Sequence, residues 1–598
     1  MENKKQAIIL SGVAIVALLA LIIGATYAYF RASGNSGSNT DINVTTYTLD
    51  LLSFEMGSDI KINADQTSFA SGKGNATGST FAKAILTANN KTNTATKNYY
   101  MYLNISNNTF TYTQNENTPE LLLTITDVSG NAITSITGLT YKTVIDGKGT
   151  SVSGFDITTK SGLLTLFDNR EITASPTKTE EWNVTVTFVN YNVNQTGNAG
   201  KSFNAKLMIQ QEEYELTLAD ICAGKTLSDC VISQYTGTQG DNALYYHNST
   251  LTNGAGDNSY RYAGGDYVLT EAGKATGATM MIGYNNSVTT ALIDFYCNGT
   301  KQYVGYASSC STSHYYLIKG DTTQYQTYNE ALSASVEKGY LTKDNVKNFV
   351  CFGTDASPCP TENLYRIIWV FNNQVKLVKW DYAKSSLLGT DGDFSQEYTS
   401  NYFSGEQGES PSSNSLYYWN NAGTNTWSAS KLNTVNLNTN FTTNIGTAWA
   451  NKIATTTWKV GGGTYANLRD AVPKTAYQYE VGSSASTTTY DAKIGLMYVS
   501  DYYYSASPSA WTLVGYNSDY TKSYASAKGE NWLYGGGWDW TISRYSDNSY
   551  RAFYVDYFGY VSHDNVGFNN GVRPSFSLLS STTYVSGSGS MSDPVRIN

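Results

Sequence analysis

The strongest constraint on the fold is an alternation of apolar and polar residues through the first third of the chain. Successive strand side chains point to opposite faces, so this pattern predicts strands with one buried face and one solvated face. Turn signals such as Asp146-Gly147 and Ser129-Gly130-Asn131 separate the runs. The apolar positions of five runs are Tyr47, Leu49 and Leu51; Met101, Leu103 and Ile105; Leu121, Leu123 and Ile125; Trp182, Val184, Val186 and Phe188; and Phe203, Ala205, Leu207 and Ile209. We predict one antiparallel β-sandwich over residues 40–212.

An uncharged apolar run, Ala7–Phe30, follows Lys4-Lys5 near the start of the chain. As a helix, this run is long enough to cross a hydrocarbon core of about 30 Å. A basic start and an apolar middle also suit a cleaved signal peptide. An uncleaved anchor would place Arg31 onward outside the cell. Both alternatives export the rest of the chain, so we predict a signal peptide or membrane anchor over residues 1–30 and a flexible leash over 31–39.

Six cysteines occur in close pairs: Cys222 and Cys230, Cys297 and Cys310, and Cys351 and Cys359. An even number in an exported chain indicates disulfides, although six cysteines allow many pairings and local pairing is only a preference. Reduced thiols packed as small hydrophobes are the alternative. A zinc site is disfavoured, because no pair has the two-residue spacing and the three histidines are scattered. Apolar residues at helical spacing over Leu216–Ile232 and Tyr328–Val350 complete a predicted disulfide-stapled α+β module, residues 213–360.

The last predicted domain covers residues 361–598. Two apolar runs flank Asn372-Asn373 and predict a β-hairpin. Lys493–Asp501 predicts a buried strand, and Trp449 and Ile453 lie one helical turn apart. Together these elements predict a multidomain protein whose folded parts are dominated by strands.

Two resemblances accompany these patterns. Gly24–Phe30, the leash after it and Tyr47–Leu51 resemble the camelysin and TasA family of exported Gram-positive matrix proteins. That resemblance implies a jelly-roll or immunoglobulin-like sandwich and, in some members, assembly into fibres. Camelysin is described as a metalloprotease, but this chain has no HExxH motif and only three histidines, so no catalytic residue is carried over.

The second resemblance covers about Leu364 to the C-terminus. A Tyr-Arg-Ile-Ile hairpin, Leu-Met-Tyr-Val-Ser-Asp at 496–501 and Gly-Val-Arg-Pro at 571–574 are similar to uncharacterised surface domains of gut Firmicutes. Those domains are in turn similar to the C-type-lectin-like fold of the formylglycine-generating enzymes, which implies an α+β architecture more than an activity. The reactive cysteines of those oxidases have no counterpart after Cys359.

The candidate binding residues lie in Asn531–Leu578. Three tryptophans surround the Gly535-Gly536-Gly537 turn, and Tyr, Ser, Asn and Asp, which binding loops favour, follow it. We expect Trp532, Trp538, Phe553, Val555 and Phe576 in the core. The predicted exposed ligand-binding residues are Trp540, Arg544, Tyr545, Asp547, Asn548, Tyr550, Asp556, Tyr557, Tyr560, His563, Asp564, Asn565 and Asn569.

Catalytic and metal motifs are weak. Asp391-Gly392-Asp393 has carboxylates at calcium-loop spacing but lacks the later glycine and glutamate of an EF-hand, which favours a turn. His563 and Asp564 are adjacent, and neighbours on a strand point to opposite faces, which disfavours an acid–base pair. We predict no enzyme activity, cofactor or metal. A net charge of −9 and a pI near 5.1 argue against nucleic acid as a partner.

Two functions remain. The first is a non-catalytic binding or adhesion protein, secreted or held at the extracellular face of a Gram-positive-type membrane through residues 7–30, with a glycan or protein ligand. The second is a self-assembling matrix or fibre subunit, for which strands with polar faces and low charge are suited. A further hypothesis is that a retroelement diversifies Arg544–Asn570, since Asn codons mutated at adenine become Tyr, Ser, Asp or His.

Overall fold

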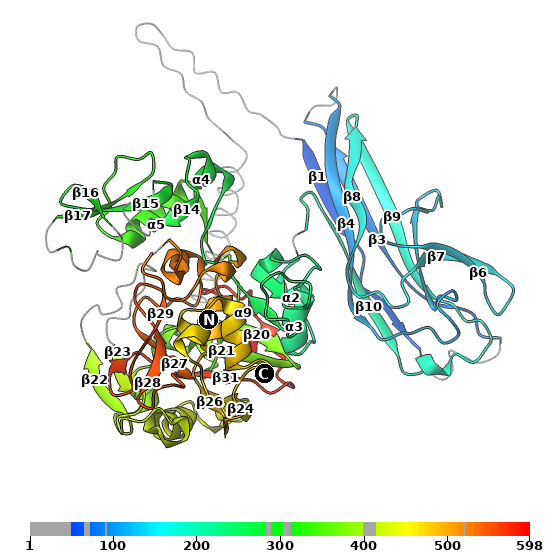
Figure 1. The fold of residues 1–598 in the computed structure, drawn as a ribbon. Coiled ribbons are helices and arrows are strands. Elements are labelled where there is room, and N and C mark those ends of the chain that lie inside the picture. The colour runs from blue at the N-terminus through cyan, green and yellow to red at the C-terminus, as the bar shows by residue number, and fades with distance from the viewer. Residues whose placement is uncertain are drawn as a thin grey trace, which may run out of the picture. The chain divides into compact units, whose positions relative to one another are not determined.

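The protein is described from a computed structural model (Figure 1). It describes residues 50–64, 72–89, 93–214, 216–282, 289–302, 310, 313–343, 345–398, 414–519 and 521–598. The chain divides into two compact units, Met1–Leu216 and Thr217–Asn598, which we call the first and second unit. Antiparallel β-sheet dominates both, with short helices and three disulfide bonds.

The first unit, blue to cyan in Figure 1, consists of two antiparallel sheets with one shared core. One sheet has the strand order β1-β3-β9-β5-β7-β6 and the other has the order β2-β10-β4-β8. This is the sandwich-like arrangement that the alternation predicts. The strands are β1 Leu51–Met56, β2 Ile60–Asn63, β3 Ala76–Thr87, β4 Ala95–Asn108, β5 Leu121–Asp127, β6 Tyr141–Ile145, β7 Ser151–Asp156, β8 Gly162–Ala174, β9 Thr177–Phe188 and β10 Ser202–Gln210.

Four of the five alternating runs have their apolar side chains in this core, as predicted, on β4, β5, β9 and β10. The first run differs, because Leu51 begins β1 with 57 % of its surface exposed, and Tyr47 and Leu49 lie outside the described residues. β1 is the end strand of its sheet and pairs with β3. A strand at a sheet edge has less cover than a central one, which accounts for the exposed residue.

The second unit is built on a seven-stranded sheet of order β11-β12-β20-β21-β31-β26, with β19 also paired to β20. The predicted hairpin at Asn372-Asn373 is confirmed between β20 and β21, and both asparagines have the positive φ that a two-residue hairpin turn requires. We placed a domain boundary at residue 360, whereas this sheet includes strands from both sides of that position. The strands are β11 Leu244–Tyr246, β12 Tyr260–Tyr262, β19 Phe349–Cys351, β20 Leu364–Phe371, β21 Gln374–Lys379, β26 Ile494–Gly495 and β31 Ser575–Ser577.

A smaller lobe of the second unit has its own apolar core and contains the Cys297–Cys310 disulfide. Its elements are β13 Val268–Leu269, α4 Glu271–Ala275, β14 Met280–Ile282, β15 Ala291–Cys297, β16 Thr300–Gln302, β17 His314–Ile318, α5 Tyr328–Glu337 and β18 Leu341–Thr342.

Short sheets and helices complete the second unit around its central sheet (Figure 1). The strands are β22 Phe394–Tyr398, β23 Asn414–Tyr418, β24 Thr456–Lys459, β25 Thr489–Ala492, β27 Asp539–Arg544, β28 Arg551–Val555, β29 Val561–Asn565, β30 Asn569–Asn570, β32 Tyr584–Ser586 and β33 Arg596–Ile597. The helices and helical turns include α2 Leu218–Cys222, α3 Leu227–Ser233, α6 Ser385–Leu388, η7 Leu432–Phe441, α8 Thr447–Ala450, η8 Tyr465–Arg469, α9 Pro473–Glu480, α10 Val499–Tyr504, η9 Pro508–Thr512 and η10 Tyr524–Glu530.

Two predicted elements are corrected. Lys493–Asp501 is not one strand, because α10 begins at Val499 after the two-residue strand β26. The Asp501 carboxylate accepts the Tyr498 backbone N–H at 2.9 Å and so favours a helix at this point. The predicted helical stretch Tyr328–Val350 is helical only as α5, and its remainder contributes β18 and β19.

The three disulfides join the predicted local partners: Cys222–Cys230, Cys297–Cys310 and Cys351–Cys359. The predicted membrane segment, Ala7–Phe30, lies outside the described residues. Within the part of the chain that the structure describes, we find no helix long and apolar enough to span a membrane.

Candidate functional site

The three-stranded sheet β27-β28-β29 positions the candidate site on the second unit. Phe553 on β28 lies opposite His563 on β29, and Val555 lies opposite Val561. Phe553, Val555 and Val561 are buried, whereas His563 is only partly covered. The apolar residues therefore hold the sheet against the core and leave His563 at its accessible end. Asp564 pairs in register with Ala552, so it points to the opposite face from His563, as predicted.

Two of the predicted ligand-binding residues, Trp540 and Asp556, are buried, and these predictions of exposure are wrong. The Trp540 indole is fully enclosed and donates its N–H to the Tyr417 carbonyl at 3.0 Å. The Asp556 carboxylate accepts hydrogen bonds from Trp538 Nε1 at 3.2 Å and from the Phe558 N–H at 2.7 Å, within the β28–β29 turn. An indole and a carboxylate with such internal partners stabilise the sheet instead of facing a ligand.

The predicted core residues are mostly correct. Trp532, Phe553, Val555 and Phe576 are buried, while Trp538 is partly exposed. The Trp538 ring packs edge-on against Tyr557 at 5.2 Å between centroids.

The remaining predicted binding residues lie at two ends of the sheet, since the β27–β28 and β28–β29 turns of an antiparallel meander are on opposite sides. Asp547 and Tyr550 are exposed in the first turn, and Arg544, Tyr545 and Asn548 are partly buried there. Tyr557 and Tyr560 belong to the second turn. Asp564, Asn565 and Asn569 follow along β29 and β30, all partly exposed, and Asn569 donates to the Ser395 hydroxyl at 3.0 Å.

A stack of three rings covers the open end of β29. The Tyr465 ring, from η8, lies 4.0 Å from the Tyr545 ring and 4.1 Å from the His563 imidazole, with nearly parallel planes. All three side chains are partly exposed. The structure thus brings together Tyr545 and His563, which the sequence indicated, and adds Tyr465, which it did not.

A glycine segment, residues 461–463, sets Tyr465 in this position. Gly462 has φ +62°, and a Cβ there would overlap the Arg544 carbonyl oxygen. The close approach allows the Gly463 N–H to donate to that carbonyl at 3.2 Å, and Thr464 then caps η8. This second triple glycine, separated from Tyr465 only by Thr464, is the sequence signal that could have indicated the site.

Two arginines border the stack. Arg551 Nη1 donates to the Tyr465 hydroxyl at 2.9 Å, and its guanidinium lies 5.7 Å from the Tyr550 ring, which is 43 % exposed. Arg469 forms a two-point ion pair with Asp470, and its guanidinium lies 4.3 Å from Tyr465. Among the residues described, no carboxylate is within ion-pair distance of Arg551, and Asp564 attracts it only from farther away, so its guanidinium has no ion-pair partner.

His563 is held neutral between these arginines. The pKa of His563 is lowered to about 4, mainly by burial and further by the charges of Arg551 and Arg469. Asp470 has a smaller effect in the opposite direction. Arg469 Nη1 lies 3.3 Å from Nε2, and an arginine can only donate. Arg551 Nη1 lies 3.4 Å from Nδ1, so both ring nitrogens face arginine donors, and the Tyr465 hydroxyl lies 3.2 Å from Nδ1.

The rings and guanidinium groups form a continuous line, which we call the aromatic–arginine row. Beyond Arg469 it continues to Tyr516, 4.6 Å from that guanidinium, and to Tyr560, 5.2 Å from the Tyr516 ring. Sequence reasoning missed four of its eight members: three come from other parts of the chain, and Arg551 lies within the predicted stretch but was not selected. The row consists of Tyr465, Arg469, Tyr516, Tyr545, Tyr550, Arg551, Tyr560 and His563.

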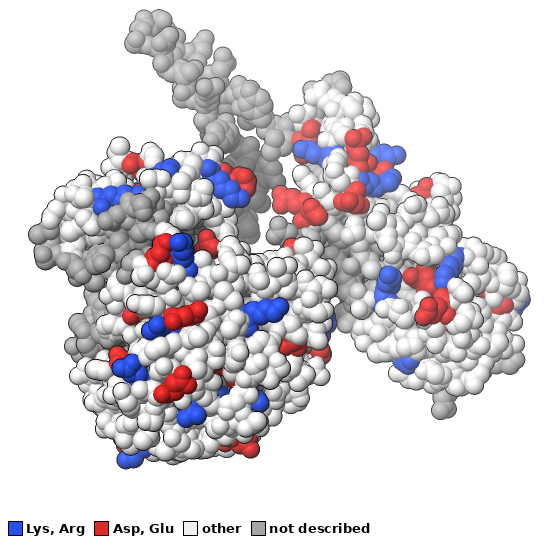
Figure 2. Space-filling view, viewed as in Figure 1, with Lys and Arg blue, Asp and Glu red and all other residues white. Residues whose placement is uncertain are grey.

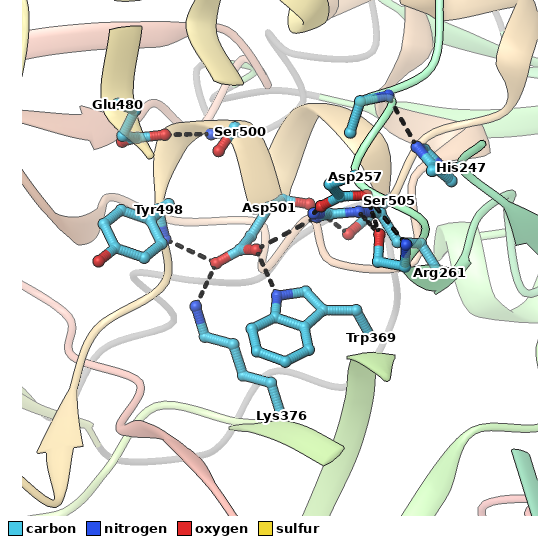
Figure 3. A network of polar contacts seen from close by, with 12 residues as sticks. His247, Asp257, Arg261, Trp369, Lys376, Glu480, Tyr498, Ser500, Asp501 and Ser505 are labelled. Carbon is cyan, nitrogen blue, oxygen red and sulfur yellow. Dashed lines mark hydrogen bonds and ion pairs between the residues drawn. The ribbon is translucent and has the colours of Figure 1, made fainter. Parts of the chain in front are cut away.

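A second polar cluster lies inside the second unit (Figure 3). Asp501, on α10, accepts hydrogen bonds from Lys376 Nζ at 2.6 Å and Trp369 Nε1 at 3.2 Å, and lies 3.7 Å from Arg261 Nη1. Arg261 also pairs with Asp257 at 2.8 Å. Two buried cations thus meet two carboxylates, and the charges balance. Burial lowers the pKa of Lys376.

Glu480 extends this cluster at the end of α9. Its carboxylate accepts the backbone N–H groups of Val499 and Ser500 at 2.9 and 2.8 Å, and the Ser543 hydroxyl. These donors are the first free N–H groups of α10, where an anion is favoured. The cluster therefore anchors α10 to α9 and to the central sheet.

Metal binding has little support in the geometry. The Asp391–Asp393 stretch forms a turn, and the Asp393 carboxylate joins it to distant segments by accepting the backbone N–H groups of Asn421 at 3.0 Å and Leu432 at 2.7 Å. Over the described ranges, no group of three or more His, Cys, Asp or Glu side chains is arranged to hold a metal ion.

No protein-family model matches the chain, and no curated protein matches it. The site is therefore interpreted from its own chemistry.

We predict that Lys376→Met destabilises the second unit by about 3–5 kcal/mol, because it leaves the buried Asp501 with a weaker set of partners. Urea unfolding followed by tryptophan fluorescence measures the loss. Trp182 is the first unit's only tryptophan, so ten of the chain's 11 report on the second unit. Lys474→Met, at an exposed position of α9, is the control and should change stability little. Equal stability of the two variants would contradict the anchoring role.

A pH dependence follows from Asp556. Burial raises the pKa of Asp556 to about 6, so its contribution to stability is full below about pH 4 and is lost as the pH rises through 6. Relative to the Asp556→Asn variant, the free energy of unfolding of the protein should fall by about 2–3 kcal/mol between pH 4 and pH 7. The measurement is the free energy of unfolding of both proteins across this range. Parallel curves would show that Asp556 titrates normally in the folded state.

Proposed function

We propose that the protein is a non-catalytic, exported binding protein whose aromatic–arginine row contacts a ligand. The observation that carries this proposal is the position of Arg551: a guanidinium with no ion-pair partner among the described residues, beside the exposed Tyr550 ring and the partly exposed Tyr465–Tyr545–His563 stack. Aromatic rings and arginines whose role is to stabilise the fold would be buried in the core or paired with a carboxylate. Tyrosine and arginine at a surface are also the residues that dominate binding energies.

Several features support display outside the cell. Three disulfide bonds are consistent with an extracellular or secreted protein. Charged residues lie singly or beside an opposite charge on the mostly uncharged face of the second unit in Figure 2. With the apolar Ala7–Phe30 run, these features support an anchored or secreted protein of the Gram-positive type.

The family resemblances remain part of the proposal. The first unit's two-sheet architecture is compatible with a sandwich of the camelysin and TasA type. The β20–β21 hairpin and the loops around β27–β29 are compatible with a C-type-lectin-like fold in the second unit, where long loops present a ligand site. No reaction is proposed, because the buried ionisable groups of the Asp501 cluster already satisfy one another.

A glycan and protein array probed with the full protein tests this function. We expect Tyr550→Ala to weaken binding of any positive ligand by about tenfold or more, because the exposed ring loses its contact area. Tyr479→Ala is the matched control, since Tyr479 is 40 % exposed on α9 and lies outside the row. A ligand retained equally by both variants would place the binding site elsewhere.

An assembly function is the second candidate, and one feature of the first unit favours it. β8 is the end strand of its sheet over 13 residues, and within the described chain it pairs with β4 alone. Beside it lies an open cleft of about 930 Å³, whose mixed lining includes the apolar Ile136, Leu139 and Leu164 and the charged Asp168, Arg170 and Glu171. A free strand edge next to a partly apolar cleft can take up a strand from another molecule.

Sedimentation over hours at rising protein concentration tests this alternative. If copies join through β8, large species should accumulate, and Leu164→Lys should suppress them because it places a charge in the cleft. Thr173→Lys adds the same charge at an exposed position of β8 that does not line the cleft and should not. A stable monomer at every concentration would exclude the matrix function under these conditions.

A further inference from the structure

We propose that the aromatic–arginine row binds an anionic saccharide, whose carboxylate or sulfate pairs with Arg551 while its sugar rings pack on Tyr550 and Tyr545. This inference rests on the proposed binding function and adds the chemical class of the ligand. It is argued from the charge of the row, from the arrangement of its rings and from its length.

The charge argument concerns Arg551. Its guanidinium has five N–H donors, and among the described residues only Nη1 has hydrogen-bond partners, Tyr465 and His563. His563 is neutral, and Asp564 acts on Arg551 only through a longer-range attraction, since it lies beyond ion-pair distance. Arg469, by contrast, is already neutralised by both oxygens of Asp470. A ligand that brings one carboxylate or sulfate would complete the row, since planar anions suit the guanidinium fork.

The ring argument concerns the neighbours of that guanidinium. The Tyr550 side chain is 43 % exposed, and its ring lies 5.7 Å from the Arg551 guanidinium. Tyr545 is on the other side of Arg551, where its ring stacks on Tyr465. A sugar ring presents C–H groups on its face and an acidic group at its rim. One acidic sugar can therefore contact a tyrosine ring and the arginine beside it at the same time.

The length of the row favours a chain of sugars over a single one. From Tyr550 it runs past Arg551, Tyr465 and Arg469 to Tyr516, which is 38 % exposed, and it ends at the partly exposed Tyr560. Both ends are thus accessible to solvent, and rings alternate with guanidinium groups between them. An acidic peptide could satisfy Arg551 as well, but its side chains offer no flat apolar face that repeats along such a row.

Isothermal titration of the full protein with four probes of similar length tests the proposal. The probes are oligogalacturonate, the neutral oligogalactose, a chondroitin sulfate oligosaccharide and polyglutamate. We expect oligogalacturonate or the sulfated chain to bind at least about tenfold more tightly than the neutral chain. Arg551→Gln should remove this preference, and Lys474→Gln, which deletes the same charge at an exposed position of α9, should retain it. The chondroitin sulfate chain carries glucuronate carboxylates as well as sulfates, so tighter binding of this chain than of oligogalacturonate would identify the sulfate as the group recognised.

A second readout reports on the site itself. An anion at Arg551 offsets the field of the two arginines, so the pKa of His563 should rise from about 4 when the acidic saccharide is bound. NMR titration of the His563 ring in the free and in the saccharide-bound protein measures this shift. Asp470 is not substituted in either sample. An anion bound elsewhere on the surface would leave the His563 pKa unchanged and would overturn the assignment.

The remaining outcomes separate the inference from the proposed function. Equal binding of the acidic and neutral saccharides, lost in Tyr550→Ala but kept in Arg551→Gln, would overturn the anionic ligand and leave the binding site. Tighter binding of polyglutamate than of either acidic saccharide would assign the row to an acidic peptide. Binding of no probe, together with an array on which Tyr550→Ala changes nothing, would overturn the proposed function of the row as well.

Discussion

The second unit depends on the buried carboxylate of Asp501. It joins α10 to three strands of the central sheet, through Arg261 on β12, Trp369 on β20 and Lys376 on β21. Two cations and two anions that leave water together are tolerable only when each finds a partner at short range. The same carboxylate accepts the Tyr498 N–H, so one group determines both where α10 begins and where it packs. Glu480 reinforces that start from α9.

This rigid interior has a consequence at the surface. α9 follows η8 closely in the chain, so the anchoring of α9 against α10 restrains the segment that carries Tyr465 and Arg469. The β27–β29 sheet is held separately by its own buried residues, Trp540 on β27 and Asp556 in the β28–β29 turn. The aromatic–arginine row lies where these two supported elements meet. Side chains held this firmly lose little conformational freedom on binding, which suits a recognition site.

Local sequence patterns predicted much of the fold. Alternation placed the cores of β4, β5, β9 and β10 correctly, since one residue in two faces inward whatever the partner strand is. Asn372-Asn373 marked a hairpin because asparagine tolerates positive φ. The cysteine pairs were close enough in sequence for local bonding. Lys493–Asp501 was misjudged for the opposite reason: its helix depends on partners more than a hundred residues away.

The candidate site shows the same limit of prediction from local sequence. Tyr545, Tyr550 and His563 could be selected because binding residues of these types gather near the C-terminus, but Trp540 and Asp556 share that composition and are buried. Composition alone does not say which side of a strand faces solvent when both faces are aromatic.

The sequence by itself therefore determined the β-rich character of the chain and favoured its local disulfides without fixing them, because these follow from periodicity, spacing and residue type. Only the tertiary structure decided which rings form the row, because Tyr465 and Arg469 reach it from a segment some hundred residues away along the chain, through contacts that no local pattern encodes.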